Sequence, residues 1–239
     1  MSTAPRISAI LPAHNEEGVI AGVVQRTAAA LLDSRVPEPE IVVVDDGSTD
    51  RTAELVASVS TPGVATRVVS HQVNRGYGAA LRTGFESATG DALWLMDSDG
   101  QFDPAELTRL LDEYRPGRLV CGYRIQRRDN AVRRLNSAAF FTLVHAAVGP
   151  TVRDVNCGFK LFPAAVGNGL RADGALISTE LVVRAIRSGY EVVEVGVQHY
   201  PRTRGQASGG DPRVVARAFA ELWQLRRNLD SLNGLNPPG

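Results

Sequence analysis

The sequence has few cysteines, no long apolar run and no excess of charge of either sign. Two cysteines among 239 residues make no disulfide framework, and they lack the spacing of a metal site. The 26 basic side chains balance 26 acidic ones, which leaves no overall field to attract nucleic acid. There is no signal-peptide pattern and no stretch of 18 apolar residues. We therefore expect a cytoplasmic globular protein with no nucleic-acid partner, which at most makes peripheral contact with the inner face of a membrane.

Short aliphatic segments alternate with amphipathic ones along most of the chain. The expected strands are residues 7–11, 40–44, 67–70, 92–96, 119–122, 159–162 and 192–197. The expected helices are residues 16–32, one beginning near 51, 76–88, 131–148, 178–188 and about 212–230. Such alternation is typical of parallel βαβ units with both sheet faces covered. The sequence has no repeat or linker, and it predicts one α/β domain over 1–239 with a mostly parallel central sheet flanked by helices.

Polar clusters directly follow three of the expected strands. They are His14-Asn15-Glu16, Asp45-Asp46 and Asp97-Ser98-Asp99. In an open parallel sheet, ligands bind outside the carboxyl ends of the strands. The three clusters therefore indicate one site at that edge.

Asp97 and Asp99 stand two residues apart in a turn after a buried strand, and Gln101 adds a neutral oxygen. Both carboxylates can reach one hard cation, so the motif favours Mg²⁺ or Mn²⁺ with substrate phosphates completing the shell. The alternative is a polar turn in which an aspartate caps the helix that Pro104 begins. An EF-hand is excluded because its ladder of Asp and Asn and its terminal Glu are missing.

The Asp45-Asp46 pair ends the second expected strand. One carboxylate is suited to accept hydrogen bonds from a base N–H or a ribose hydroxyl, while the other serves as a helix cap. Two capping carboxylates remain the alternative.

The segment Asn74-Arg75-Gly76-Tyr77-Gly78 precedes an expected helix. Its glycines allow the backbone to approach a ligand closely, and a helix N-terminus beside an arginine favours phosphate. A dinucleotide-binding site is disfavoured, because Pro-Ala-His-Asn-Glu stands where the glycine-rich fingerprint would follow the first strand.

Two groups of arginines lie in the second half of the chain. They are Arg124, Arg127, Arg128, Arg133 and Arg134, followed by Arg202 and Arg204. Runs of this kind are commonly solvated surface. The functional alternative is a set of guanidinium clamps for anionic donor and acceptor groups.

Several motifs in a fixed order carry a family resemblance between about Ile7 and Ser208. They are Pro12-Ala13-His14-Asn15-Glu16, Val44-Asp45-Asp46-Gly47-Ser48-Thr49-Asp50, Asn74-Arg75-Gly76-Tyr77-Gly78, Asp97-Ser98-Asp99-Gly100-Gln101, Gly122-Tyr123-Arg124, Asp154-Val155-Asn156-Cys157-Gly158-Phe159-Lys160 and His199-Tyr200-Pro201-Arg202. Together they resemble the family 2 glycosyltransferases of GT-A fold, most closely the polyprenol-phosphate (dolichol-phosphate) mannose synthase branch.

The resemblance implies roles for individual residues. Ala13, Glu16 and Asp46 would line a nucleoside pocket. Asp97, Asp99 and Gln101 would hold the metal, and Arg202 would meet the donor phosphates. Arg133 and Ser137, with Arg124 beside them, would serve a lipid phosphate. The rest of the expected substrate-binding set is Pro12, Asn15, Asp45, Arg75, Gly76, Met96 and Ser98.

One motif departs from the family. Relatives often carry Arg-x-x-Gly-x-Ser-Lys, whereas this chain has Arg202-Thr203-Arg204-Gly205-Gln206-Ala207-Ser208. The serine is shifted and the lysine is missing, so the resemblance does not define how this loop would contact the acceptor.

The resulting hypothesis is metal-assisted, inverting transfer of a hexose, mannose or glucose. The donor would be a nucleoside diphosphate sugar of the GDP-mannose or UDP-glucose type, and the acceptor polyprenyl phosphate. The expected catalytic residues are Asp97, Asp99, Arg124 and Glu180. A phosphate acceptor needs no general base, whereas a soluble hydroxyl acceptor would need one. Glu180 is the candidate for that base, and it is equally a first-turn glutamate favoured by the helix dipole.

Other readings remain open. A nucleotidyltransferase would, like a glycosyltransferase, bind a metal and a nucleotide. A non-catalytic nucleotide-sugar-binding module would have the same pocket without the activity. The final helix, about 212–230, has an apolar side and an arginine-rich side, so it could pack on the domain or lie on a membrane surface. The sequence leaves the nucleobase, the sugar and the oligomeric state open, with a homodimer among the states considered.

Overall fold

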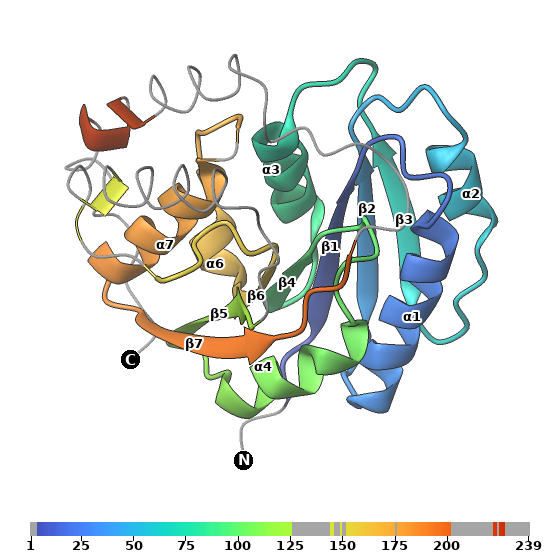
Figure 1. The fold of residues 1–239 in the computed structure, drawn as a ribbon. Helices are drawn as coiled ribbons and strands as arrows, with labels where there is room; N and C mark the ends of the chain where they lie inside the picture. Colours follow the sequence, from blue (N-terminus) through green and yellow to red (C-terminus); the bar gives the residue numbers. More distant parts are fainter. Residues whose placement is uncertain are drawn as a thin grey trace.

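The computed structural model describes residues 4–125, 144–145, 149, 152–174, 176–201, 222–223 and 225–227. Within these residues, seven strands form one sheet in the order β3-β2-β1-β4-β6-β5-β7 (Figure 1). The strands are β1 (Ile7–Ala13), β2 (Glu40–Asp45), β3 (Ala65–Ser70), β4 (Ala92–Met96), β5 (Arg118–Arg124), β6 (Phe159–Pro163) and β7 (Glu191–Val197). The helices are α1 (Ile20–Asp33), α2 (Thr52–Ser58), α3 (Tyr77–Ser87), the 3-10 helix η1 (Pro104–Glu106), α4 (Leu107–Glu113), α6 (Ala164–Gly167) and α7 (Ile177–Arg187).

The sheet is mixed but mostly parallel. β1 pairs in parallel with β2 and β4, β2 with β3, and β5 with β7. β6 runs antiparallel to both of its neighbours, β4 and β5. These pairings confirm the expected α/β class with a mostly parallel central sheet.

Alternate residues of each central strand face opposite layers of helices. In β1, Ala9 and Leu11 join the apolar layer under α1, α2 and α4, whereas Ile10 joins the layer under α3, α6 and α7. Both sheet faces are therefore covered (Figure 1), which explains why the central strands read as continuous aliphatic runs.

The strands β1 and β4 separate at their carboxyl ends. Their pairing ends at Ile10 and Leu95, whereas β1 continues to pair with β2 as far as Ala13 and Asp45. The crossover through α1 lies on one face of the sheet and the crossover through α3 lies on the other. The boundary between β1 and β4 is thus the point where the winding of the sheet reverses, the usual position of a ligand crevice in this architecture.

Several element boundaries differ from the sequence prediction by one to four residues, and two of these flank the loop after β1. The first strand continues through Pro12 to Ala13. The main-chain N–H of Asp46 donates to the carbonyl of Ala13, so Ala13 bonds toward β2 and Pro12 is turned toward β4. Because the ladder with β4 has ended at Ile10, the missing N–H of Pro12 leaves no gap in the ladder.

The first helix begins at Ile20, four residues later than expected. Asn15 has a left-handed φ of 55°, which interrupts a helical path there. The main-chain N–H groups of Asn15 and Glu17 donate to side chains in the loop after β2, and that of Glu16 donates to Thr52 at the start of α2. Contact between these two loops therefore takes the place of the first helical turn.

The second half of the chain is described in part. The short helix α6 was not expected from the sequence. Leu222 and Leu225, in the expected final helix, are buried against Leu176 and Val183 of the α7 region. At these positions the helix packs on the domain; the rest of it, and most of the helix expected at 131–148, lies outside the described residues. In the part of the chain that the structure describes, no helix is long and apolar enough to cross a membrane.

Candidate functional site

The turn of residues 97–101 leaves β4 just beyond the point where its pairing with β1 ends. Ser98 is buried, and its hydroxyl donates to the carbonyl oxygen of Pro12 at 2.6 Å, which ties the ends of the two strands together. Asp99 accepts a hydrogen bond from the main-chain N–H of Gln101 at 3.0 Å, while Gly100 has a φ of 76°. The turn therefore has a defined shape with two carboxylates on it.

Asp97 is held on two sides. The hydroxyl of Tyr77 donates to its Oδ1 at 2.9 Å, and its main-chain N–H donates to the carbonyl of Gly158 at 3.0 Å. A Cβ on Gly158 would come within 2.0 Å of the Asp97 Oδ2, so a side chain at that position would collide with the carboxylate. Tyr77 and Gly158 thus fix where this carboxylate points.

The electrostatic surroundings of Asp97 disfavour its charged form. Burial and the neighbouring negative charge of Asp99 raise the pKa of Asp97 to about 7. The Tyr77 hydroxyl, Lys160 and Arg124 act in the opposite direction but do not outweigh them. The two aspartates are therefore close enough to repel one another, a repulsion that a cation bound between them would relieve.

Gln101 joins the turn to the segment after β7. Its side-chain nitrogen donates to the carbonyl of Tyr200 at 2.8 Å, and the N–H of Tyr200 donates to the Gln101 carbonyl at 2.8 Å. The Gln101 amide oxygen is the atom that could ligate a metal. These bonds place Tyr200 beside the turn of residues 97–101. Arg202 follows two residues later and lies outside the described residues.

Asp46, directly after β2, binds the loop that precedes α3. Its Oδ1 accepts from the N–H of Arg75 at 2.9 Å and contacts Nδ1 of His71 at 2.7 Å, and its Oδ2 accepts from the N–H of Gly76 at 2.8 Å. The side chain is buried. Asp46 therefore shapes the turn of residues 75–76, a function that the sequence did not suggest.

The side chains of Asp45 and Asn15 both accept hydrogen bonds from the loop after β2. Asp45 is buried at the end of β2, and its Oδ1 accepts from the N–H of Ser48 at 3.1 Å. The Asn15 side-chain oxygen accepts from the N–H of Thr49 at 2.8 Å. The loops after β1 and β2 are in this way joined at the carboxyl ends of their strands. Pro12, Ala13 and Met96 are buried at the ends of β1 and β4, and Glu16 is half-buried beside them.

The N-terminus of α3 is closed by protein acceptors. The N–H groups of Gly78 and Ala79 both donate to the carbonyl of Asp173, at 2.8 and 3.3 Å, and those of Arg75 and Gly76 donate to Asp46. These four N–H groups are therefore engaged within the chain, and phosphate binding at this segment stays a prediction. The side chain of Arg75 is exposed, so its guanidinium stays a candidate.

Arg124, the last residue of β5, forms a bidentate ion pair with Asp154. Its Nε and NH2 donate to the two carboxylate oxygens at 2.8 and 2.7 Å. An anionic ligand at Arg124 would share the guanidinium with Asp154. The other predicted arginines (Arg127, Arg128, Arg133, Arg134, Arg202 and Arg204) and Ser137 lie outside the described residues.

Glu180 lies in the first turn of α7 and is 3 % exposed. Its carboxylate accepts from the N–H of Arg171 at 2.9 and 3.0 Å and from the N–H of Ala172 at 2.8 Å. Its role as a base stays a prediction.

The family model for glycosyl transferase family 2 matches residues 8–166, about two thirds of the chain. The chain belongs to glycosyl transferase family 2.

Curated relatives agree with this family assignment. One is the undecaprenyl-phosphate 4-deoxy-4-formamido-L-arabinose transferase of Edwardsiella ictaluri (strain 93-146), 32% identical over 213 residues, which are 87% of this chain and 64% of that protein. The enzyme of the same name from Pseudomonas aeruginosa (strain LESB58) is 33% identical over 217 residues, 89% of this chain and 63% of that protein. The chain thus spans less than two thirds of the length of these relatives. Their names place them among polyprenol-phosphate sugar transferases, in agreement with the expected branch.

Solved structures match the fold. Mannosyl-3-phosphoglycerate synthase from Rubrobacter xylanophilus aligns with a TM-score of 0.69 and 23% identity, over 98% of this chain and 78% of that one. Glucosyl-3-phosphoglycerate synthase from Mycobacterium tuberculosis, in complex with Mn²⁺, UDP-glucose and phosphoglyceric acid, aligns with a TM-score of 0.64 and 22% identity, over 98% and 81%. At these identities the likeness shows the shared GT-A fold.

In this family 2 glycosyltransferase, the turn after β4 offers oxygen donors of the type that Mg²⁺ and Mn²⁺ bind. They are the carboxylates of Asp97 and Asp99 and the amide oxygen of Gln101. Among the described residues there is no cluster of three or more His, Cys, Asp or Glu side chains arranged to hold a metal. Two carboxylates and one amide oxygen fill only part of the shell of Mg²⁺ or Mn²⁺, so this donor set fits a cation that takes its other ligands from a bound substrate or water.

Three residues of the site were not predicted as functional. They are Tyr77 and Gly158, which fix Asp97, and the fully buried Lys160, whose Nζ donates to the carbonyls of Val155 (3.0 Å) and Cys157. All three stand in motifs that carry the family resemblance, and a lysine within the apolar strand Phe159–Pro163 was a further signal. In this chain Lys160 supplies a buried positive charge that acts to lower the pKa of Asp97.

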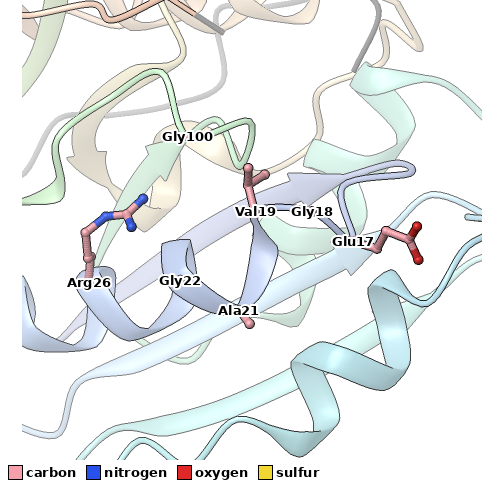
Figure 2. Close-up of a pocket in the computed structure, with 7 residues that line it drawn as sticks. All are labelled: Glu17, Gly18, Val19, Ala21, Gly22, Arg26 and Gly100. Carbon is pink, nitrogen blue, oxygen red and sulfur yellow. The ribbon is translucent and has the colours of Figure 1, made fainter. Parts of the chain in front are cut away.

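A separate hollow of about 360 Å³ lies on the α1 side of the 97–101 turn (Figure 2). The side chain of Val19 points toward the turn at Gly100. In this view, Glu17 and Arg26 lie on opposite sides of Val19. The described residues that line it are Glu17, Gly18, Val19, Ala21, Gly22, Arg26 and Gly100, a set that includes none of the predicted site residues. We therefore assign the candidate site to the strand ends and not to this hollow.

Proposed function

We propose that this chain catalyses metal-dependent, inverting transfer of a sugar from a nucleoside diphosphate sugar to polyprenyl phosphate. The observation that carries the proposal is the pair Asp97 and Asp99, held in one turn at the crevice between β1 and β4. Asp97, Asp99 and Gln101 would hold Mg²⁺ or Mn²⁺, which stabilises negative charge on the departing diphosphate when bound. Membership of the family supports the same chemistry.

The donor half of the site would lie over the ends of β1, β2 and β4. The nucleoside would contact the first two strands, and Arg75 and Arg202 would meet the diphosphate. A hexose donor of the GDP-mannose or UDP-glucose type is the finer proposal. The residues assigned to this half are Pro12, Ala13, Asn15, Glu16, Asp45, Asp46, Arg75, Gly76, Met96, Ser98 and Arg202.

The acceptor half would bind the phosphate of the lipid near Arg124, Arg133 and Ser137. A phosphate oxygen is already anionic, so its attack on the sugar needs no general base. The task of the arginines is to offset repulsion between the two phosphate groups and to align the attack. The two relatives named for undecaprenyl phosphate support this choice of acceptor.

A lipid acceptor implies contact with the inner face of a membrane. Trp223 is 61% exposed, and the guanidinium of Arg227 lies 4.5 Å from the centre of its ring. Arg226 is exposed beside them, while the opposite side of the segment packs on α7 through Leu222 and Leu225. An outward-facing tryptophan with two arginines suits an anionic membrane surface, so we propose peripheral attachment there.

A transfer assay with Mn²⁺ tests the proposal. Purified protein is incubated with radiolabelled UDP-glucose or GDP-mannose and undecaprenyl phosphate, with Asp99→Asn as the test variant and the exposed Asp112→Asn on α4 as the matched control. We expect label in the lipid fraction for the parent and the control, and loss of at least about 100-fold for Asp99→Asn or with EDTA. Transfer that continues in EDTA would show that the reaction needs no divalent metal. Transfer only to a soluble hydroxyl acceptor would replace the lipid, and binding without turnover would leave a nucleotide-sugar-binding module.

A further inference from the structure

The segment of residues 171–173, between α6 and α7, is anchored to the start of α7 by Glu180. The carboxylate of Glu180 accepts hydrogen bonds from the main-chain N–H groups of Arg171 (2.9 and 3.0 Å) and Ala172 (2.8 Å). Because Glu180 is only 3 % exposed, these bonds replace hydration of the carboxylate, and losing them would leave buried polar groups unpaired. The segment therefore depends on Glu180 for its position.

The same segment also contacts the start of α3. The carbonyl of Asp173 accepts from the N–H groups of Gly78 (2.8 Å) and Ala79 (3.3 Å). A Cβ on Gly78 would lie 2.5 Å from the Asp173 carbonyl carbon, so the glycine is what allows this close approach. The Arg82 guanidinium donates to the carbonyls of Arg171 (2.6 Å) and Ala172 (3.2 Å). The segment and the first turn of α3 are thus joined as one unit.

The start of α3 carries the residue that holds Asp97. Tyr77 is the first residue of α3, directly before Gly78, and its hydroxyl donates to the Asp97 Oδ1 at 2.9 Å. A shift of this turn by a fraction of an ångström would lengthen that bond. A continuous series of contacts therefore runs from Glu180 through residues 171–173 and the first turn of α3 to Asp97.

We propose that Glu180 is a positioning residue: its carboxylate fixes residues 171–173 against α3 and so keeps the Tyr77 hydroxyl on Asp97. This inference rests on the proposed function only in giving Asp97 a part in sugar transfer. It assigns Glu180 a different role from that of a base. A general base must direct a lone pair at the proton of the acceptor, whereas the Glu180 oxygens are directed at two main-chain N–H groups of its own chain.

Hydrogen exchange measures the coupling without any ligand. In Glu180→Ala, the amides of Gly78 and Ala79 should exchange about tenfold faster than in the parent, because the acceptor at Asp173 is no longer held. Glu180→Gln keeps a side-chain oxygen for the two N–H groups and should restore slow exchange. Glu86→Gln, an exposed change on α3 itself, is the matched control and should leave exchange unaltered. Unchanged exchange in Glu180→Ala would overturn the proposal.

Arg82→Ala covers the case in which Glu180→Ala does not fold. It removes the second attachment of residues 171–173 without touching Glu180, and it should also speed exchange at Gly78 and Ala79. If both attachments can be removed without effect on these amides, the segment does not hold α3 and the inference fails.

Transfer kinetics then distinguish positioning from base catalysis. For a positioning residue, Glu180→Gln should keep kcat within about threefold of the parent with the same pH profile, and Glu180→Ala should add little to the loss caused by Tyr77→Phe. For a base, both Glu180 variants should lose about 100-fold or more, together with the acid limb of the profile. The second pattern would overturn the proposal. A parent protein that transfers no sugar refutes the proposed function alone, because the exchange measurement still decides whether Glu180 holds α3.

Discussion

The hydroxyl of Ser98 donates to the carbonyl oxygen of Pro12 at 2.6 Å, and both residues are buried where β1 and β4 have stopped pairing. This hydrogen bond replaces the missing ladder between the two strands. It holds the turn that carries Asp97 and Asp99 against the end of β1 while the backbones diverge. One side chain thus keeps the ends of the two strands together beyond the last residues that pair.

Replacing Ser98 with alanine should destabilise the protein by about 1–3 kcal/mol, because the carbonyl of Pro12 would be left buried without its donor. The free energy of unfolding is measured in urea. Ser58→Ala, which removes an exposed hydroxyl bonded within α2, should cost much less. Equal costs for the two serines would contradict a structural role for the Ser98 bond.

Replacing Gly158 with alanine should strongly reduce Mn²⁺-dependent transfer. The added Cβ would lie 2.0 Å from the Asp97 Oδ2, so the carboxylate would have to leave its place beside Tyr77. Gly117→Ala is the control, since a Cβ there meets nothing within 4 Å. We expect a loss of about 100-fold for Gly158→Ala, in line with losing the orientation of a metal-binding carboxylate. Parent-like transfer would show that Asp97 need not be held where the structure has it.

The stability of the fold should depend on pH through Glu40. Burial acts to raise the pKa of its carboxyl, but hydrogen bonds from Ser8, the N–H of Thr89 and Arg67 outweigh it and lower the pKa. The folded state therefore favours the ionised form. Its stabilising contribution is complete above the unfolded pKa of about 4.3 and is lost as the pH falls through the folded pKa.

Glu40→Gln removes this dependence. The variant should be less stable than the parent at about pH 7, and the gap should be narrower at a second, acidic pH below the unfolded pKa of about 4.3, because the parent loses this contribution as the pH falls. Urea unfolding at the two pH values measures the gap, with the exposed Glu113→Gln as control. A gap that stays the same at both values would mean that ionisation of Glu40 does not contribute.

The strands and the position of the site could be predicted from sequence because their signals are local. Aliphatic runs identify buried strands, and the polar residues directly after them, such as Asp45 and Asp97, necessarily fall at the carboxyl edge. Pairs such as Tyr77 with Asp97 join distant parts of the chain and leave no periodic signal. The sequence likewise shows no sign that the N–H groups of Gly78 and Ala79 donate to the carbonyl of Asp173, a residue far along the chain.

The central claim is that Asp97 and Asp99 hold a divalent cation beside the diphosphate of the donor. A crystal of the full chain grown with UDP and Mn²⁺ tests it through the anomalous signal of manganese. The account predicts one manganese peak in contact with an Asp99 oxygen and with the diphosphate, beside Asp97 and Gln101. Nucleotide bound at the strand ends with the turn of residues 97–101 facing away from both the metal and the diphosphate would contradict it.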